Sequence, residues 1–207
     1  MPNHMDRGPH TGLEPGTLAS DMTPAQLKSV LSNFDFDELL RIQLPPASGI
    51  RNAAVFDLQD LLPVGASSKP FASRFNGKPE QLRVLADIFS ASSAPAGTVP
   101  REASEGLPLG GATYTVSGPR GGQFPLEVAV LHGKKDGGGG DGDGEDDVLF
   151  ASVTASVLVL VQADPAVADA QQRARADSAE AASVAREKDT VWTSIRSFTQ
   201  ALTSRGL

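Results

Sequence analysis

The stretch "VLFASVTASVLVLVQA", residues 148–163, constrains the fold more than any other part of the chain. It is long, apolar and rich in β-branched residues, which favour strands because their side chains pack well on a pleated surface. A nearly continuous apolar strand is typical of the centre of a sheet, where both faces are buried. We therefore predict one long central strand here, which the rest of the chain has to cover.

The whole chain suits one domain with appendages, since it has 207 residues of which 40% are hydrophobic. It has no cysteine, which excludes disulfides, thiol chemistry and Cys-based zinc sites. The net charge of -7 argues against broad nucleic-acid binding. The sequence shows no apolar run of the ~20 residues that a membrane span needs, no signal-peptide segment and no Gly at position 2 for myristoylation. We therefore expect a soluble, intracellular protein without a membrane anchor of its own.

The first expected element is a helix with a clear start. Thr23 is suited to be its N-cap, Pro24 fits the first helical position and Gln26 stands at the capping-box position. Apolar residues with helical spacing follow, namely Leu27, Val30, Leu31 and Phe34. Residues 35–42 either extend this helix or form a second short one, and the helix has to end before Pro45.

A tight β-hairpin is expected next, over "GIRNAAVFDLQDLLPVGASS", residues 49–68. Two short apolar runs flank the polar corner at residues 57–60, as in a hairpin whose strands meet at a turn. We predict that residues 68–78 are a loop and that a helix begins near Pro79. The apolar side of that helix comprises Leu82, Leu85, Ile88 and Phe89.

The second half of the chain alternates Gly-rich connections with strand-like segments. The connections are a Ser/Ala/Pro/Gly loop over residues 91–111 and a flexible acidic loop, "KKDGGGGDGDGEDD", over residues 134–147. The strands are "ATYTVSG" over residues 112–118 and "FPLEVAVLHG" over residues 124–133. A last helix starts at Asp164-Pro165, and its apolar stripe comprises Val191, Ile195, Phe198 and Leu202.

This order of helix, two strands, helix, three strands and helix resembles the roadblock/LC7 family, whose members share a profilin-like α/β/α fold. Four segments carry the resemblance. "PAQLKSVLSNF" is similar to the first helix of the family, "RNAAVFDLQDLLPVGASS" to its first hairpin and "EQLRVLADIFSAS" to its second helix. "VLFASVTASVLVLVQADPAVADAQQRARA" is similar to the final strand and last helix. The match spans residues 24–185 with gaps at the loops, and Gln59-Asp60 stands where the family often has Asp-Gly.

The resemblance implies an α/β sandwich in which a five-stranded, mostly antiparallel sheet is flanked by helices. We therefore divide the chain into three parts. Residues 1–21 are expected to be a disordered tail, because they are rich in Pro, Gly and polar residues. The roadblock-like domain is expected over residues 22–185 and a C-terminal helical extension over residues 186–207.

The long helix beyond the last strand looks more like the roadblock-type subunit of the lysosomal Ragulator complex, called EGO in fungi, than like the shorter dynein light chains. The phrase "QLKSVLS" is similar to that subunit too. The resemblance implies a non-catalytic scaffold that pairs with another roadblock or longin-like subunit. Such a scaffold would hold Rag-type small GTPases at the lysosome or vacuole for mTOR-complex signalling, and would reach the membrane through a lipidated partner. The alternatives are a dynein-associated roadblock light chain and a GTPase-activating roadblock homodimer.

The acidic loop does not have the spacing of a calcium site. An EF-hand loop needs Gly at its sixth position and Glu at its twelfth, whereas counting from Asp141 gives Asp146 and Ser152. The Gly-rich "SGPRGGQ" has no Lys and precedes a strand, so it predicts a β-turn instead of a phosphate-binding loop.

The histidines give no sign of a catalytic or metal site. They are His4, His10 and His132, and they form no His-x-x-x-His pair. The sequence also has no Gly-x-Ser-x-Gly elbow for a serine nucleophile. We predict no catalytic residue, no cofactor, no metal and no enzymatic activity.

Two surfaces are candidates for partner binding. The first joins the helix side with Leu82, Leu85, Ile88 and Phe89 to the strand residues Thr113, Tyr114, Thr115 and Val116. We expect this strand to be an edge strand, and an edge without charged residues pairs readily with another strand. The second candidate is the stripe of Val191, Ile195, Phe198 and Leu202, which either folds back on its own domain or docks on a partner.

Overall fold

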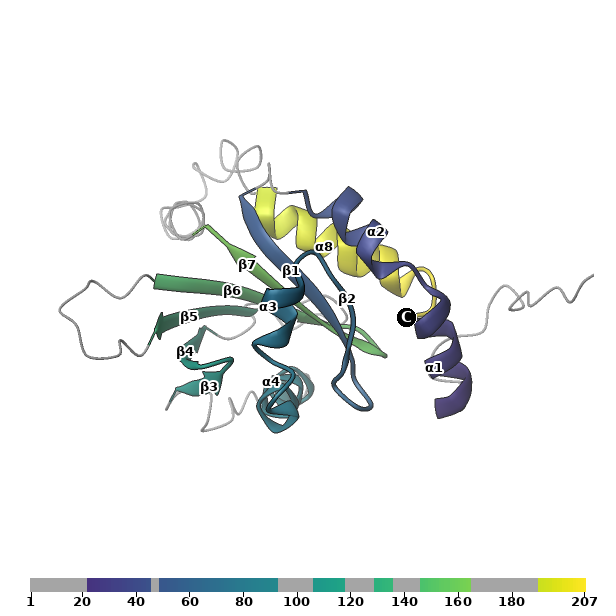
Figure 1. The fold of residues 1–207 in the computed structure, drawn as a ribbon, viewed down its shortest axis with the longest axis horizontal. Helices are drawn as coiled ribbons and strands as arrows, with labels where there is room; N and C mark the ends of the chain where they lie inside the picture. Colours follow the sequence, from purple (N-terminus) through teal and green to yellow (C-terminus); the bar gives the residue numbers. More distant parts are fainter. Residues whose placement is uncertain (1–21, 46–48, 93–105, 118–128, 136–145, 165–189) are drawn as a thin grey trace, which may run out of the picture.

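The computed structural model describes residues 22–45, 49–92, 106–117, 129–135, 146–164 and 190–207 (Figure 1). Its strands are β1 (Ile50–Asp57), β2 (Pro63–Ala66), β3 (Leu107–Leu109), β4 (Ala112–Ser117), β5 (Ala129–Lys135), β6 (Asp146–Val153) and β7 (Val157–Ala163). Its helices are α1 (Pro24–Asn33), α2 (Phe36–Gln43), α3 (Lys69–Ser73), α4 (Pro79–Ser92) and α8 (Thr190–Thr203). The predicted tail over residues 1–21 lies outside the described residues.

The strands form one seven-stranded antiparallel sheet in the order β2-β1-β7-β6-β5-β4-β3. The expected five-stranded sheet is therefore wrong, and it differs from the observed sheet in two places. One expected strand is a hairpin, and a further strand lies in a segment expected to be a loop.

The apolar stretch over residues 148–163 is a β6–β7 hairpin, not one central strand. Thr154 makes the turn: its N–H donates to the carbonyl of Val157 at 2.9 Å, and its hydroxyl accepts from the N–H groups of Ser156 and Val157. A threonine hydroxyl can replace a backbone group in a turn without any Gly or Pro. Because the turn contains neither Gly nor Pro, the sequence pattern predicted one unbroken strand, and this prediction is wrong.

The additional strand β3 lies at the end of the expected 91–111 loop and pairs with β4. Gly110 and Gly111 connect the two strands with φ values of 57° and 84°. This left-handed pair is typical of a two-residue hairpin turn, and glycine adopts it at little cost. As a result β4 lies between β3 and β5, so the prediction that residues 112–118 form an edge strand is wrong.

Helices cover the sheet on both faces. The first core contains buried residues of α1, α2 and α8 together with alternate residues of the strands, and Figure 1 shows α2 and α8 lying side by side. The second core contains buried residues of α3 and α4 and the other set of alternate strand residues. Of the expected loop at residues 68–78, the part from Lys69 to Ser73 is therefore a helix that belongs to the second core.

The local signals at the first helices are confirmed. The capping box of α1 is present, because Thr23 N–H donates to Gln26 Oε1 at 2.9 Å and the Thr23 hydroxyl accepts from Gln26 N–H at 3.4 Å. Residues 35–42 do not extend α1. Instead, a separate helix α2 begins at Phe36, and its N-cap Asp35 accepts from Glu38 N–H at 2.9 Å.

The β1–β2 hairpin is also present, with a connection that contains a left-handed residue other than glycine. Leu61 has a φ of 57°, and its N–H donates to the carbonyl of Asp57 at 2.8 Å. The carboxylate of Asp60 accepts from Leu62 N–H at 3.1 Å and binds Lys28 of α1 at the same distance. The acidic corner thus joins the hairpin to α1.

The acidic loop is shorter than expected, because Lys134 and Lys135 belong to β5 and Asp146 and Asp147 belong to β6. The segment between them, residues 136–145, lies outside the described part of the chain. None of the helices among the described residues is long and apolar enough to cross a membrane.

A close approach between α2 and β2 generates the first prediction. A Cβ added at Gly65 would collide with the Cβ of Phe36, and both are backbone-fixed atoms. We expect Gly65→Ala to lower the free energy of unfolding by about 1–3 kcal/mol, as overpacking does. Urea denaturation measures this change. The matched control is Gly77→Ala, since nothing lies within 4 Å of a Cβ there. Equal stability of the two variants would contradict the packing.

Candidate functional site

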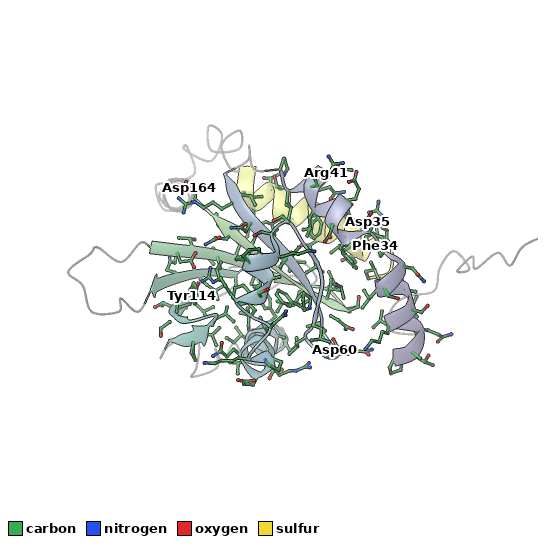
Figure 2. All side chains as sticks on the ribbon, in the orientation of Figure 1. Phe34, Asp35, Arg41, Asp60, Tyr114 and Asp164 are labelled. Atoms are coloured by element: carbon green, nitrogen blue, oxygen red, sulfur yellow. The ribbon has the colours of Figure 1, made fainter. Side chains whose placement is uncertain are left out.

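A row of polar side chains crosses the sheet on the face covered by α3 and α4. Tyr114 of β4, which is labelled in Figure 2, is paired with Gly133 of β5, and Gly133 is paired with Asp147 of β6. Gln162 of β7 and Asn52 of β1 are paired with each other, and their side chains lie on the same face of the sheet as that of Asp147. We call Asn52, Arg74, Tyr114, Asp147 and Gln162 the polar ladder; Arg74 joins it from the segment just after α3.

Asp147 is the hub of the polar ladder. Its Oδ2 accepts from the Tyr114 hydroxyl at 2.7 Å and from Arg74 Nη2 at 2.8 Å. Its Oδ1 accepts from Gln162 Nε2 at 2.7 Å. Gln162 in turn accepts from Asn52 Nδ2 at 2.7 Å. Both carboxylate oxygens are therefore bonded to side chains of the same chain.

Gly133 makes room for this arrangement. A Cβ at position 133 would collide with the ring of Tyr114, which lies over this residue. With a glycine there, the tyrosine hydroxyl reaches across β5 to the carboxylate of Asp147 on β6. The guanidinium of Arg74 lies over the rings of Phe71 and Phe75, 5.9 and 5.5 Å from their centroids. These contacts fix it above the sheet, since cations are attracted to aromatic faces.

The electrostatics of the ladder keep Asp147 charged and Tyr114 neutral. Burial alone would raise the pKa of Asp147, but hydrogen bonds from Gln162, Arg74 and Tyr114 outweigh it and leave the pKa below its usual value. Burial, and then the neighbouring carboxylate, raise the pKa of Tyr114. Burial would lower the pKa of Arg74, but the hydrogen bond to Asp147 and the nearby negative charge raise it.

The polar ladder joins the end of α3 to four strands, β1, β4, β6 and β7. The oxygens of Asp147 accept three hydrogen bonds from side chains, and the raised pKa of Tyr114 keeps its hydroxyl protonated. Among the residues that the structure describes, no three His, Cys, Asp or Glu side chains are placed to hold a metal ion.

The structure places the predicted interface residues in different surroundings. Leu82, Leu85, Ile88 and Phe89 of α4 lie in the second core together with Tyr114 and Val116. Thr113 and Thr115 point to the opposite face and are exposed. Val191, Ile195, Phe198 and Leu202 all lie in the first core, each with 0% exposure. The α8 stripe therefore packs on its own domain, and a partner role for any of these residues stays a prediction.

Sequence reasoning missed four members of the polar ladder, Asn52, Arg74, Asp147 and Gln162. A weak signal existed for two of them. Asp147 is the acidic residue directly before the apolar stretch, and Gln162 is an amide within it. A charged or amide residue inside a strand has to find a partner when the strand is buried, which marks both as network candidates.

Two buried polar atoms of the described residues have no hydrogen-bond partner, His132 Nε2 and Ser156 Oγ. They lie on separate elements, β5 and the β6–β7 turn, and outside the polar ladder. His132 is thus not brought together with the carboxylate of Asp147.

Comparison with known proteins gives no match, either among protein-family models or among curated proteins.

The pKa of Asp147 generates a prediction about acid unfolding. A carboxyl group whose folded pKa is lowered contributes stability above its unfolded pKa of about 4, and this contribution is lost as the pH falls through the folded pKa. We expect Asp147→Asn to be less stable than the wild type by about 2–5 kcal/mol at pH 7. The difference in unfolding free energy between the two proteins should become smaller as the pH falls below about 4. Urea denaturation at several pH values measures this difference.

Asp60→Asn is the matched control, because Asp60 also holds an ion pair but at the surface, with side-chain exposures of 33% for Asp60 and 68% for Lys28. Its effect should stay below about 1 kcal/mol. A gap for Asp147→Asn that is the same at pH 7 and at about pH 2 would show that the carboxylate is not charged in the fold.

Proposed function

We propose that this protein is a non-catalytic scaffold subunit that binds another roadblock or longin-like subunit. One structural observation carries the proposal: the buried carboxylate of Asp147 has both oxygens bonded within the chain, so the most chemically distinctive group described here has a structural role. The resemblance of the first helix, the first hairpin and the α4 segment supplies the class of partner. The same resemblance supports the finer proposal of Rag-type GTPase signalling to the mTOR complex at the lysosome or vacuole.

The exposed side of β4 is the part of the predicted interface that a partner can reach. Thr113 and Thr115 are exposed, while Tyr114 and Val116, which alternate with them, are buried in the second core. Val130 and His132 of the neighbouring strand β5 are half-buried on the same face. We propose this face, defined by Thr113, Thr115, Val130 and His132, as the partner surface.

The experiment is affinity purification from the source cells, followed by reconstitution with the recombinant proteins recovered. We expect a roadblock or longin-like subunit and, through it, Rag-type GTPases. Dynein intermediate chain would instead favour the light-chain alternative, and a polarity GTPase would favour the GTPase-activating homodimer. A chain that stays monomeric with every purified roadblock or longin-like subunit would refute the proposal.

The surface is tested by the double variant Thr113→Arg with Thr115→Arg. Charged side chains at the contact should weaken binding of the recombinant partner at least about tenfold, while exposed substitutions leave stability within about 0.5 kcal/mol. Isothermal titration calorimetry measures the affinity. Thr193→Arg, an exposed threonine on α8, is the matched control and should bind like the wild type. Unchanged affinity of the double variant would show that the partner binds another surface. It would not refute the proposed scaffold function.

A further inference from the structure

The two outermost strands of the described sheet are β2 and β3. The outer edge of such a strand presents unpaired N–H and C=O groups, which pair readily with a strand of another molecule. Proteins avoid this by covering or interrupting the edge groups. The two edges of this sheet therefore determine whether a second chain can extend it.

The β3 edge carries a proline, Pro108, at a position whose backbone nitrogen faces outward. The turn at Gly110 and Gly111 makes Leu109 and Ala112 the hydrogen-bonded pair next to it, as in a two-residue hairpin. Pairs alternate in an antiparallel ladder, so the next pair, Pro108 and Thr113, directs its backbone groups away from the partner strand. The nitrogen of Pro108 thus faces the outer edge, where it has no hydrogen to donate.

The β2 edge is closed by a side chain. Ser67 N–H donates inward to the carbonyl of Ala53 at 2.9 Å, so the preceding N–H, that of Ala66, points outward. Asp37 of α2 accepts this N–H through its Oδ1 at 2.8 Å. The close approach of Phe36 to Gly65 holds α2 against the same strand.

From these two contacts we propose that Pro108 and Asp37 close the sheet to strand addition, by a second copy of this chain or by an extended segment of a partner. Pro108, at the centre of β3, has no N–H to donate outward. Asp37 accepts the outward N–H of Ala66, at the end of β2. This inference does not rest on the proposed function. It implies that any partner binds a face or a helix, which replaces the edge-strand pairing expected from the sequence.

The test opens each edge in the full-length chain. Pro108→Thr restores an outward N–H without adding apolar surface, and Asp37→Ala frees the N–H of Ala66. We expect both variants to self-associate, with the mass from light scattering rising about twofold relative to wild type at high protein concentration. Hydrogen exchange should slow in the associated state at position 108 of the first variant and at Ala66 of the second.

Asp37→Asn is the matched control, because an asparagine keeps an oxygen that can accept from Ala66 N–H, and it should behave like wild type. Circular dichroism and urea denaturation confirm that each variant is folded. Folded variants that keep the wild-type mass at high protein concentration, with no slowing of exchange at position 108 or Ala66 between low and high concentration, would overturn the inference. So would self-association of Asp37→Asn equal to that of Asp37→Ala, or a wild-type chain whose β3 edge becomes protected when its purified partner binds.

Discussion

The buried carboxylate of Asp147 is the constraint on which much of the structure depends. A charge with 7% side-chain exposure is costly unless its oxygens are bonded, and here three side chains bond them. Tyr114 can do so because Gly133 leaves space for its ring. Arg74 can do so because α3 lies against the second core. The carboxylate thus links the first strands, the short helix and the last strands of the chain.

The width of the sheet follows from the β6–β7 and β3–β4 hairpins. Each adds a strand relative to a five-stranded sheet, and a wider sheet has more surface for helices to cover. α3 and α4 cover one face together, while α1, α2 and α8 cover part of the other. The threonines of β4 are exposed on the face that α1, α2 and α8 cover only in part. We therefore place the partner surface there.

Local signals in the sequence predicted local structure. The capping box at Thr23, the β1–β2 hairpin and the apolar side of α4 each depend on residues within a few positions of one another, and the structure has all three. The β6–β7 turn was missed because the Thr154 hydroxyl takes the place of a Gly or Pro signal. The polar ladder was missed because Asn52 and Gln162 meet only through strand pairing, 110 positions apart. No periodicity in one segment predicts such a contact.

The Arg74–Asp147 ion pair fastens α3 to the sheet. A double-mutant cycle tests it most directly, with Arg74→Gln, Asp147→Asn and the double variant compared with wild type by urea denaturation at pH 7. The two residues contact each other at 2.8 Å, so we expect a coupling energy above about 1.5 kcal/mol. A coupling energy within about 0.5 kcal/mol of zero, with all four proteins folded, would contradict the claim.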